Sequence, residues 1–208
     1  MTTAIGMVDY GMGNRRSVEK ALLRTGATVH VTADHDLLRS VDGLYVPGVG
    51  AFPAAMAALR ERGLDGLLRE RAADGVPVMG SCLGMQLLFE RSEEHGGEEG
   101  LGLLPGSVVR LDARGLKLPH IGWNEVRWAQ ETPLAEGLPD PVALYHVHSF
   151  IPRVEEDLVL GFGEYGTRFP SIVGRDRVWG AQCHPEKSSG EGLALLRNFV
   201  AQCAGVAA

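Results

Sequence analysis

Hydrophobic and polar positions in the first half of the chain follow the periods of strands and helices in turn. Short apolar runs predict buried strands at 4–8, 27–31, 43–46 and 76–79. Helical spacing of apolar residues predicts helices at 17–24, 54–73 and 82–89, the second of them broken at Gly63. Repeated alternation of strand and helix predicts a parallel sheet flanked by helices.

The pattern changes after a polar, glycine-containing segment at 90–102, which is typical of a surface loop. Short β-rich pieces separated by turns follow at 107–111, 124–128, 143–147, 158–162, 171–174 and 178–182. Leucines and Phe199 at helical spacing predict a closing helix at 192–203. We therefore expect an α/β fold in which a central, mostly parallel sheet flanked by helices carries an antiparallel β extension.

Length and composition fit one globular domain spanning 1–208, since 208 residues are enough for one α/β core and short for two. Apolar residues make up 45% and charged residues 22% of the chain. No apolar stretch approaches the ~18 residues of a membrane-spanning helix. No basic residue precedes the first apolar run, so this run is interpreted as a strand and not as a signal peptide. These features predict a cytoplasmic protein without a membrane partner.

The cysteines and the charge distribution argue against several other classes of protein. Cys82, Cys183 and Cys203 are odd in number and lack CxxC spacing, which argues against a disulfide framework and a zinc site. The net charge of −6 is spread along the chain without a basic run, so no nucleic-acid partner is expected. His146 and His148 share one face of a predicted strand, but no cysteine or carboxylate clusters with them in sequence. We predict neither a metal nor a cofactor.

The segment Gly80–Gly84 is a candidate nucleophile turn. Its central Cys82 follows a predicted strand and precedes a predicted helix, where α/β enzymes display a nucleophile. Flanking glycines allow the tight turn, and unpaired N–H groups at a helix N-terminus favour the reactive thiolate. The alternative is a buried cysteine that acts as a small hydrophobe.

A thiol nucleophile needs a base that a further group orients. Among seven histidines, only His184 in His184-Pro185-Glu186 comes with an acid placed to orient it. Pro185 favours an extended path at His184, so the side chains of His184 and Glu186 should point to the same side. The alternative is a surface histidine beside a solvated acid.

Acyl chemistry also needs donors for the tetrahedral oxyanion. The segment Pro47–Gly50 follows a predicted strand, so peptide N–H groups around Gly48 and Gly50 are candidates, together with the N–H of Leu83 after the nucleophile. Such a glycine-containing run is also typical of a simple turn.

Along the chain the three segments follow in the order Pro47–Gly50, Gly80–Gly84 and His184–Glu186, and together they resemble class I (triad-type) glutamine amidotransferases. Within that class, further segments resemble the glutaminase subunits of imidazole glycerol phosphate synthases, which serve histidine biosynthesis. These segments are DYGMGN at 9–14, PGVGAF at 47–52, PHIGWN at 119–124, YHVHSF at 145–150 and HPEKSS at 184–189.

The resemblance implies that Cys82 attacks the side-chain amide of L-glutamine, that His184 passes the proton to the leaving ammonia, and that Glu186 orients His184. Water then hydrolyses the thioester to glutamate. The remaining matches are to positions that bind the substrate or lie near it: Gly48, Gly50, Leu83, Gln86, Glu94, Ser149 and Phe150.

The resemblance also implies a partner, a separate (β/α)₈-barrel synthase subunit that receives the ammonia in a heterodimer and makes imidazole glycerol phosphate and an aminoimidazole carboxamide ribotide. Asn14, Trp123, Tyr145 and Lys187 match positions at that subunit interface. In this family the glutaminase is nearly silent until the partner binds its nucleotide substrate, and reorientation of the Pro47–Gly50 strand is the expected switch.

Three alternatives stay open at this point. A triad amidotransferase of purine, pyridoxal or anthranilate synthesis would purify with a different synthase. A cysteine peptidase or other hydrolase of similar fold would take peptides and not glutamine. A non-enzymatic module would carry an incomplete triad, whereas Cys82, His184 and Glu186 are all present.

Overall fold

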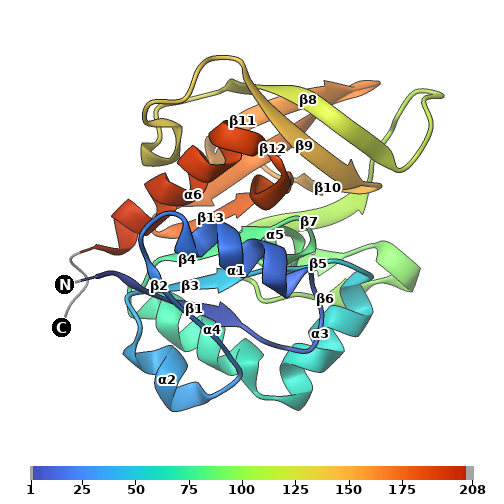
Figure 1. The fold of residues 1–208 in the computed structure, drawn as a ribbon. Coiled ribbons are helices and arrows are strands. Elements are labelled where there is room, and N and C mark those ends of the chain that lie inside the picture. Colours follow the sequence, from blue (N-terminus) through green and yellow to red (C-terminus); the bar gives the residue numbers. More distant parts are fainter. Residues whose placement is uncertain (1, 205–208) are drawn as a thin grey trace.

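The computed structural model describes residues 2–204, and a nine-stranded mixed sheet forms their centre. One half is parallel, in the order β2 (Thr28–Thr32), β1 (Ala4–Val8), β3 (Gly43–Val46), β4 (Val78–Ser81) and β13 (Val178–Ala181). The other half continues antiparallel through β12 (Thr167–Arg175), β11 (Val159–Tyr165), β8 (His120–Trp128) and β9 (Val142–His148). The predicted parallel sheet with an antiparallel extension is confirmed (Figure 1).

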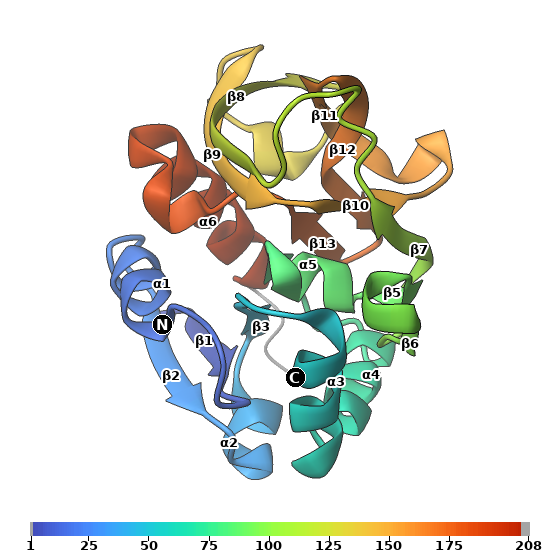
Figure 2. The ribbon, with the colours of Figure 1, turned by 90° about the vertical axis from the view of Figure 1, so that its right-hand side faces the viewer.

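Helices cover both faces of the parallel half. Helices α1 (Arg15–Leu23) and α6 (Ser189–Cys203) share one hydrophobic cluster on one face. Helices α2 (His35–Ser40), α3 (Phe52–Glu61) and α4 (Leu64–Ala73) share another cluster on the opposite face. Figure 2 shows the strands between these two layers. The break predicted at Gly63 separates α3 from α4, and α2 is a short helix that the sequence pattern did not indicate.

A second sheet corrects the prediction for 82–102. Helix α5 (Leu83–Leu87) ends before Phe89, and β5 (Phe89–Ser92) and β6 (Glu98–Glu99) join β7 (Leu104–Arg110) and β10 (Phe150–Arg153) in a four-stranded sheet. Because β5 pairs with β7, its backbone is satisfied and Phe89 and Ser92 are buried despite the neighbouring charges. Tertiary pairing overrides the polar composition that predicted a loop. The 3₁₀ helices η1 (Glu94–Gly96), η2 (Pro133–Ala135), η3 (Glu156–Leu158) and η4 (Pro185–Lys187) connect these elements.

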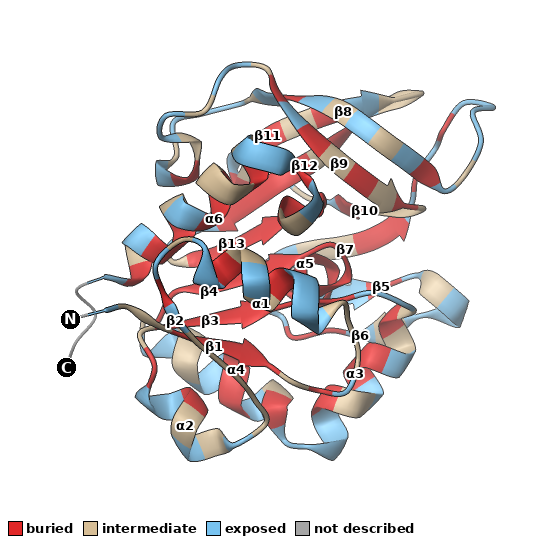
Figure 3. Cartoon of the chain, viewed as in Figure 1, coloured by how far each residue is buried: buried red, intermediate tan, exposed pale blue. Residues whose placement is uncertain are grey.

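The core follows the two faces of the sheet, where buried residues concentrate along the strands and the inner sides of the helices (Figure 3). Leu22 and Phe199 are fully buried on one face, and Leu38, Met56 and Leu68 on the other. Removal of this apolar surface from water is the main force that holds the helices on the sheet. Among residues 2–204, no helix has the length and apolar character required to cross a membrane.

The central strands bring two distant segments of the chain to one edge. Strands β4 and β13 are parallel neighbours, with Gly80 opposite Gly180 and Ser81 opposite Ala181. Their carboxyl ends therefore lie side by side, and the amide of Cys82 donates to the carbonyl of Ala181 (N···O 2.7 Å). Open α/β sheets place their active sites at this edge.

Glycine is required where α5 meets the strands. A Cβ on Gly84 would lie 1.9 Å from the carbonyl oxygen of Val46, and one on Gly80 would lie 2.3 Å from the carbonyl oxygen of Gly84. Neither contact can be relieved by a side-chain rotation, because both involve backbone atoms. The two glycines let the turn that carries Cys82 pack directly against the sheet.

Candidate active site

Cys82 occupies the sharp turn between β4 and α5 that the sequence predicts. Its backbone angles, φ 51° and ψ −115°, lie in a region that residues with a side chain rarely adopt. Such a conformation costs on the order of 1–3 kcal/mol and persists where the surrounding fold imposes it. The residue is 8% exposed, and its thiol donates to the carbonyl of Val147 (S···O 3.6 Å). The thiol is therefore held at the strand edge with limited access to solvent.

Backbone pairing beyond β13 positions His184. The amide of Gln182 donates to Ser171 O at 2.7 Å, and the amide of His184 donates to Tyr145 O at 2.8 Å. The hydroxyl of Ser188 donates to His184 O (2.7 Å) and accepts from the amide of Tyr145 (2.9 Å). These bonds tie the segment after β13 to β9 and β12, so His184 is a fixed residue of the site and not a surface histidine.

Glu186 holds one side of the His184 ring. Its Oε1 lies 3.0 Å from Nδ1 of His184, and the two side chains are 1% and 6% exposed respectively. Burial alone lowers the pKa of His184, but interactions with Cys82 and with Glu186 outweigh this penalty and raise the pKa to about 9. The structure thus brings together the three residues predicted as a triad and favours a protonated imidazole between two acidic groups.

A cavity of about 350 Å³ opens beside the thiol. Of the predicted substrate-binding residues, those on its wall are Gly50, Leu83, Gln86, Glu94, Ser149 and Phe150. The buried amide Nε2 of Gln86 donates to Phe150 O and to Gln182 Oε1, both at 3.1 Å. Glu94 accepts from the amide of Phe52 at the start of α3 (2.7 Å) through Oε2. Both side chains are therefore fixed by internal bonds while they face the cavity.

The Pro47–Gly50 segment runs between β3 and α3, beside the thiol turn. Gly48 packs against α5 rather than lining the cavity, since a Cβ there would lie 2.6 Å from the amide nitrogen of Gly84. Gly50 lines the cavity with φ 113°, a conformation that favours glycine. The hydroxyl of Tyr10 donates to Pro47 O at 2.6 Å and anchors the start of the segment.

Three other histidines lie buried close to the site. His120 and His148 share a hydrogen bond (3.0 Å), and Nε2 of His146 bonds the hydroxyl of Ser171 (2.8 Å). Burial lowers the pKa of all three and brings that of His148 to about 3. These rings are neutral near pH 7, so His184 is the histidine at the site that carries a proton.

Three of the four residues predicted at a partner interface lie close together, on β8, β9 and η4. Trp123 on β8 lies opposite Tyr145 on β9, with ring centroids 6.0 Å apart. Nζ of Lys187 lies 5.9 Å from the centre of the Tyr145 ring. Trp123 is 53% exposed and Ile121 on the same strand is 60% exposed, and Asn14 directly precedes α1. The β8–β9 surface thus presents large apolar groups to solvent.

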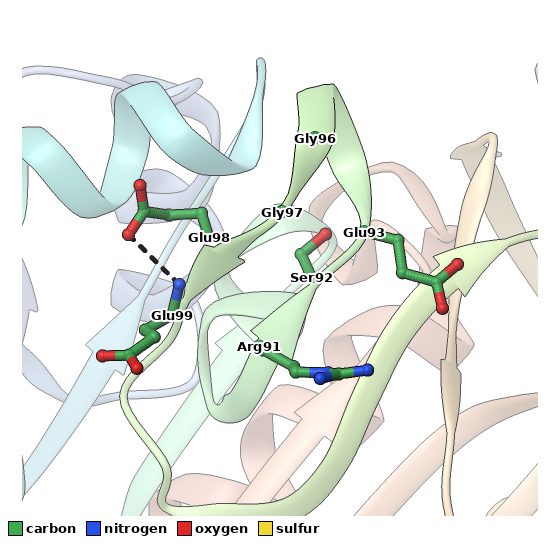
Figure 4. Close-up of a pocket in the computed structure, with 7 residues that line it drawn as sticks. All are labelled: Arg91, Ser92, Glu93, Gly96, Gly97, Glu98 and Glu99. Atoms are coloured by element: carbon green, nitrogen blue, oxygen red, sulfur yellow. Dashed lines mark hydrogen bonds between the residues drawn. The ribbon is translucent and has the colours of Figure 1, made fainter.

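A larger concavity of about 570 Å³ lies elsewhere, on the β5–β6 hairpin (Figure 4). Its side chains include Arg91, Ser92, Glu93, Glu98 and Glu99. It contains neither a thiol nor an imidazole, so it is not a second site for the same chemistry.

Four residues of the active-site cavity were not predicted from the sequence, namely Val49, Arg110, Val147 and His148. Val49 lies between the two predicted glycines, Gly48 and Gly50. Val147 contributes through its backbone carbonyl, which no side-chain pattern indicates. Arg110 ends β7 in the second sheet, whose pairing the sequence did not predict.

Comparison with known proteins assigns the chain to a family. The sequence matches the glutamine amidotransferase class-I family over residues 6–203. Solved structures of similar fold include a glutamine amidotransferase (TM-score 0.76, 23% identity, covering 96% of this chain and 98% of that one) and PurLQS from Thermotoga maritima (TM-score 0.77, 19% identity, covering 97% and 99%). The chain belongs to the class I glutamine amidotransferase family.

Individual relatives indicate which members of this class the chain is similar to. The chain is 53% identical over 196 residues to imidazole glycerol phosphate synthase subunit HisH of Desulfitobacterium hafniense (strain Y51), a match that covers 94% of this chain and 92% of the relative. It is 48% identical over 204 residues to the HisH subunit of Geobacillus thermodenitrificans (strain NG80-2), covering 95% of each. Within the class, this protein groups with the HisH subunits of imidazole glycerol phosphate synthase.

The raised pKa of His184 yields a test of the triad geometry. In ¹⁵N NMR of ring-labelled protein, we expect the His184 ring to stay protonated at pH 8, because its pKa lies at about 9. Glu186→Gln should lower this pKa, since it removes the buried carboxylate. The raised folded-state pKa also means that the protonated ring contributes fully to stability below the unfolded pKa of about 6.5 and loses this contribution as the pH rises through 9.

The matched control is Glu136→Gln, which changes an exposed acid outside the site. It should leave the His184 titration unchanged. A wild-type ring that titrates at or below its ordinary value would contradict the assignment of His184 and Glu186 as a coupled pair.

Proposed function

We propose that the chain is the glutaminase subunit of an imidazole glycerol phosphate synthase, which hydrolyses L-glutamine to glutamate and ammonia for histidine biosynthesis. The observation that carries this proposal is the arrangement of Cys82, His184 and Glu186 at one cavity, within a chain about half identical to HisH subunits. This level of identity favours that pathway over purine, pyridoxal or anthranilate synthesis. The family match argues against a peptidase.

Chemistry starts at the sulfur of Cys82. The thiolate attacks the side-chain carbonyl carbon of glutamine and forms a tetrahedral adduct with a negative oxygen. The protonated ring of His184 gives its proton to the nitrogen, the C–N bond breaks, and ammonia leaves a γ-glutamyl thioester. Water then attacks the thioester while His184 accepts its proton, which releases glutamate and the thiolate. Glu186 fixes the ring so that the nitrogen away from it faces the reaction.

The α-ammonium and α-carboxylate groups of glutamine, its α-end, lie toward Gln86, Glu94, Ser149 and Phe150 in this proposal. Glu94 supplies a carboxylate for the ammonium group, and its Oε1 is not used in the bond to Phe52. The carbonyl of Gln86 is the acceptor left on that side chain, because Nε2 already makes two bonds. Such fixed partners select an amino acid over a simple amide.

Oxyanion stabilisation comes from peptide N–H groups of Leu83 and of the segment around Gly48 and Gly50. The conformational freedom of Gly50, which already has a positive φ, allows the peptide that joins it to Val49 to rotate. We propose that this rotation is the step through which the partner turns on the glutaminase, because oxyanion donors contribute strongly to acyl transfer.

The partner is proposed to be the (β/α)₈-barrel synthase subunit, which forms a cytoplasmic heterodimer with this chain and carries out the lyase and cyclisation chemistry. Free ammonia is protonated in water, so it must pass directly to the acceptor enzyme. The exposed Trp123 and Ile121, with Tyr145 and Lys187 beside them, supply a docking surface next to the active site. Asn14 is proposed to contact the same partner.

Glutamate release in the presence of the cognate barrel subunit and its nucleotide substrate tests the function. The wild-type chain should show strong stimulation by the partner, and Cys82→Ala should lose at least about 1,000-fold in kcat, because covalent catalysis is lost. Cys183→Ala is the matched control, since this thiol is fully buried and burial raises its pKa.

Absence of stimulation by the barrel subunit would reject the pathway assignment. Full activity in Cys82→Ala would reject the mechanism. Loss of activity in a folded Cys183→Ala variant would mean that Cys82 had been wrongly chosen as the nucleophile.

Trp123→Ala tests the docking surface. Removal of a large exposed aromatic group from the centre of an interface costs about 2 kcal/mol or more, so the Kd for the barrel subunit should rise roughly 30-fold. The measurement is isothermal titration of the partner into each variant. Leu23→Ala serves as the control, because Leu23 is similarly exposed but ends α1, which packs near β2, the edge strand opposite β9. Equal affinities for wild type and Trp123→Ala would contradict the proposed surface.

A further inference from the structure

Arg110 is a charged residue of the active-site cavity that has no role in the proposed hydrolysis of glutamine so far. It ends β7, is exposed, and lines the same cavity as Cys82, Gln86 and Glu94. Among residues 2–204, no acidic side chain forms an ion pair with its guanidinium and no acceptor takes a hydrogen bond from it. A cation without a protein partner on a cavity wall is available to a ligand.

Strand pairing fixes where this cation lies. Arg110 is directly opposite Phe150 in the antiparallel pair of β7 and β10, and the amide of Leu111 donates to Ser149 O at 2.9 Å. Directly opposite residues project from the same face of a sheet. The amide of Gln86 also bonds Phe150 O (3.1 Å). Arg110 therefore lies on the wall that holds the proposed contacts to the α-end of glutamine.

Charge balance in the cavity indicates what the guanidinium binds. The α-end of an amino acid carries an ammonium group and a carboxylate, and Glu94 can pair only with the ammonium group. Nε2 of Gln86 is engaged twice, and the ring of His184 is engaged by Cys82 and Glu186, so neither is a free donor for the carboxylate. A guanidinium binds a carboxylate through two parallel hydrogen bonds.

We propose that Arg110 binds the α-carboxylate of glutamine and so makes the cavity selective for the free amino acid. This inference rests on the proposed glutaminase function and deepens it. Glutamine residues within a peptide have no free α-carboxylate, and simple amides have none either. Both would lack the bidentate contact to Arg110 and would be poor substrates.

A comparison of two substrates isolates this contact. The stimulated complex with the barrel subunit is assayed with L-glutamine and with 4-aminobutanamide, which keeps the reactive amide and the amine but lacks the carboxylate. For L-glutamine, Arg110→Gln should lower kcat/KM by about 10- to 100-fold, mainly through KM, as expected for a lost charge-assisted hydrogen bond. For 4-aminobutanamide, the same substitution should change kcat/KM by less than about two-fold, because there is no carboxylate to lose. For L-glutamine, the kcat/KM of Arg110→Lys should lie between those of the wild type and of Arg110→Gln, since lysine keeps the charge without the bidentate geometry.

Inhibition constants give the same comparison without turnover. L-glutamate and 4-aminobutanoate, the corresponding products, differ by the same carboxylate, and Arg110→Gln should weaken inhibition by L-glutamate alone. Arg153→Gln is the matched control, because Arg153 lies on β10 and pairs with Glu93 (3.8 Å) outside the cavity. It should leave all constants unchanged.

Two results would overturn the inference. Equal losses for L-glutamine and 4-aminobutanamide would mean that Arg110 acts on the fold or on the general potential of the site. No loss for either, together with unchanged inhibition by L-glutamate, would mean that it does not touch the substrate. Failure of the wild-type complex to hydrolyse glutamine would instead reject the proposed function itself.

Discussion

The parallel pairing of β4 with β13 is the constraint on which the site depends. Its register sets Ser81 opposite Ala181, so the two strands end together and the chain continues into Cys82 on one side and toward His184 on the other. The amide of Cys82 bonds Ala181 O, which ties the turn of the thiol to the strand that leads to the imidazole. A slip of one residue would reverse the faces of the side chains on either strand. The geometry of the thiol and the imidazole is therefore a property of the central sheet and not of a mobile loop.

The antiparallel half of the sheet connects this pair to the outer surface. Strand β9 gives one backbone carbonyl, from Val147, to the thiol and another, from Tyr145, to the amide of His184. The side chain of Tyr145 meets Trp123 on the face proposed for docking. One strand thus carries bonds to both reacting residues and part of the docking surface.

Much of this arrangement could be predicted from the sequence, because strong local patterns encode it. Apolar runs and glycines at 80 and 84 indicated the nucleophile turn, and Pro185 between His184 and Glu186 indicated an acid on the same side as the base. The second sheet was not predicted, because β5 has mostly polar residues and its pairing with β7 is visible only in three dimensions. Arg110 was not predicted as a site residue for the same reason, because it ends a strand of this sheet. Val147 acts through its carbonyl, which leaves no mark on the residue type, and the hydrogen bonds that engage Gln86 join residues far apart in the chain.

The proposal that Cys82, alone among the three cysteines, attacks glutamine can be tested chemically. Treatment of the complex with 6-diazo-5-oxo-L-norleucine, a glutamine-shaped electrophile, followed by peptide mass spectrometry, tests it directly. We expect one adduct, on Cys82, while Cys183 and Cys203 stay unmodified because both are buried and burial raises the pKa of each thiol. An adduct on Cys183 or Cys203, or an unmodified Cys82 in a complex that hydrolyses glutamine, would contradict this account.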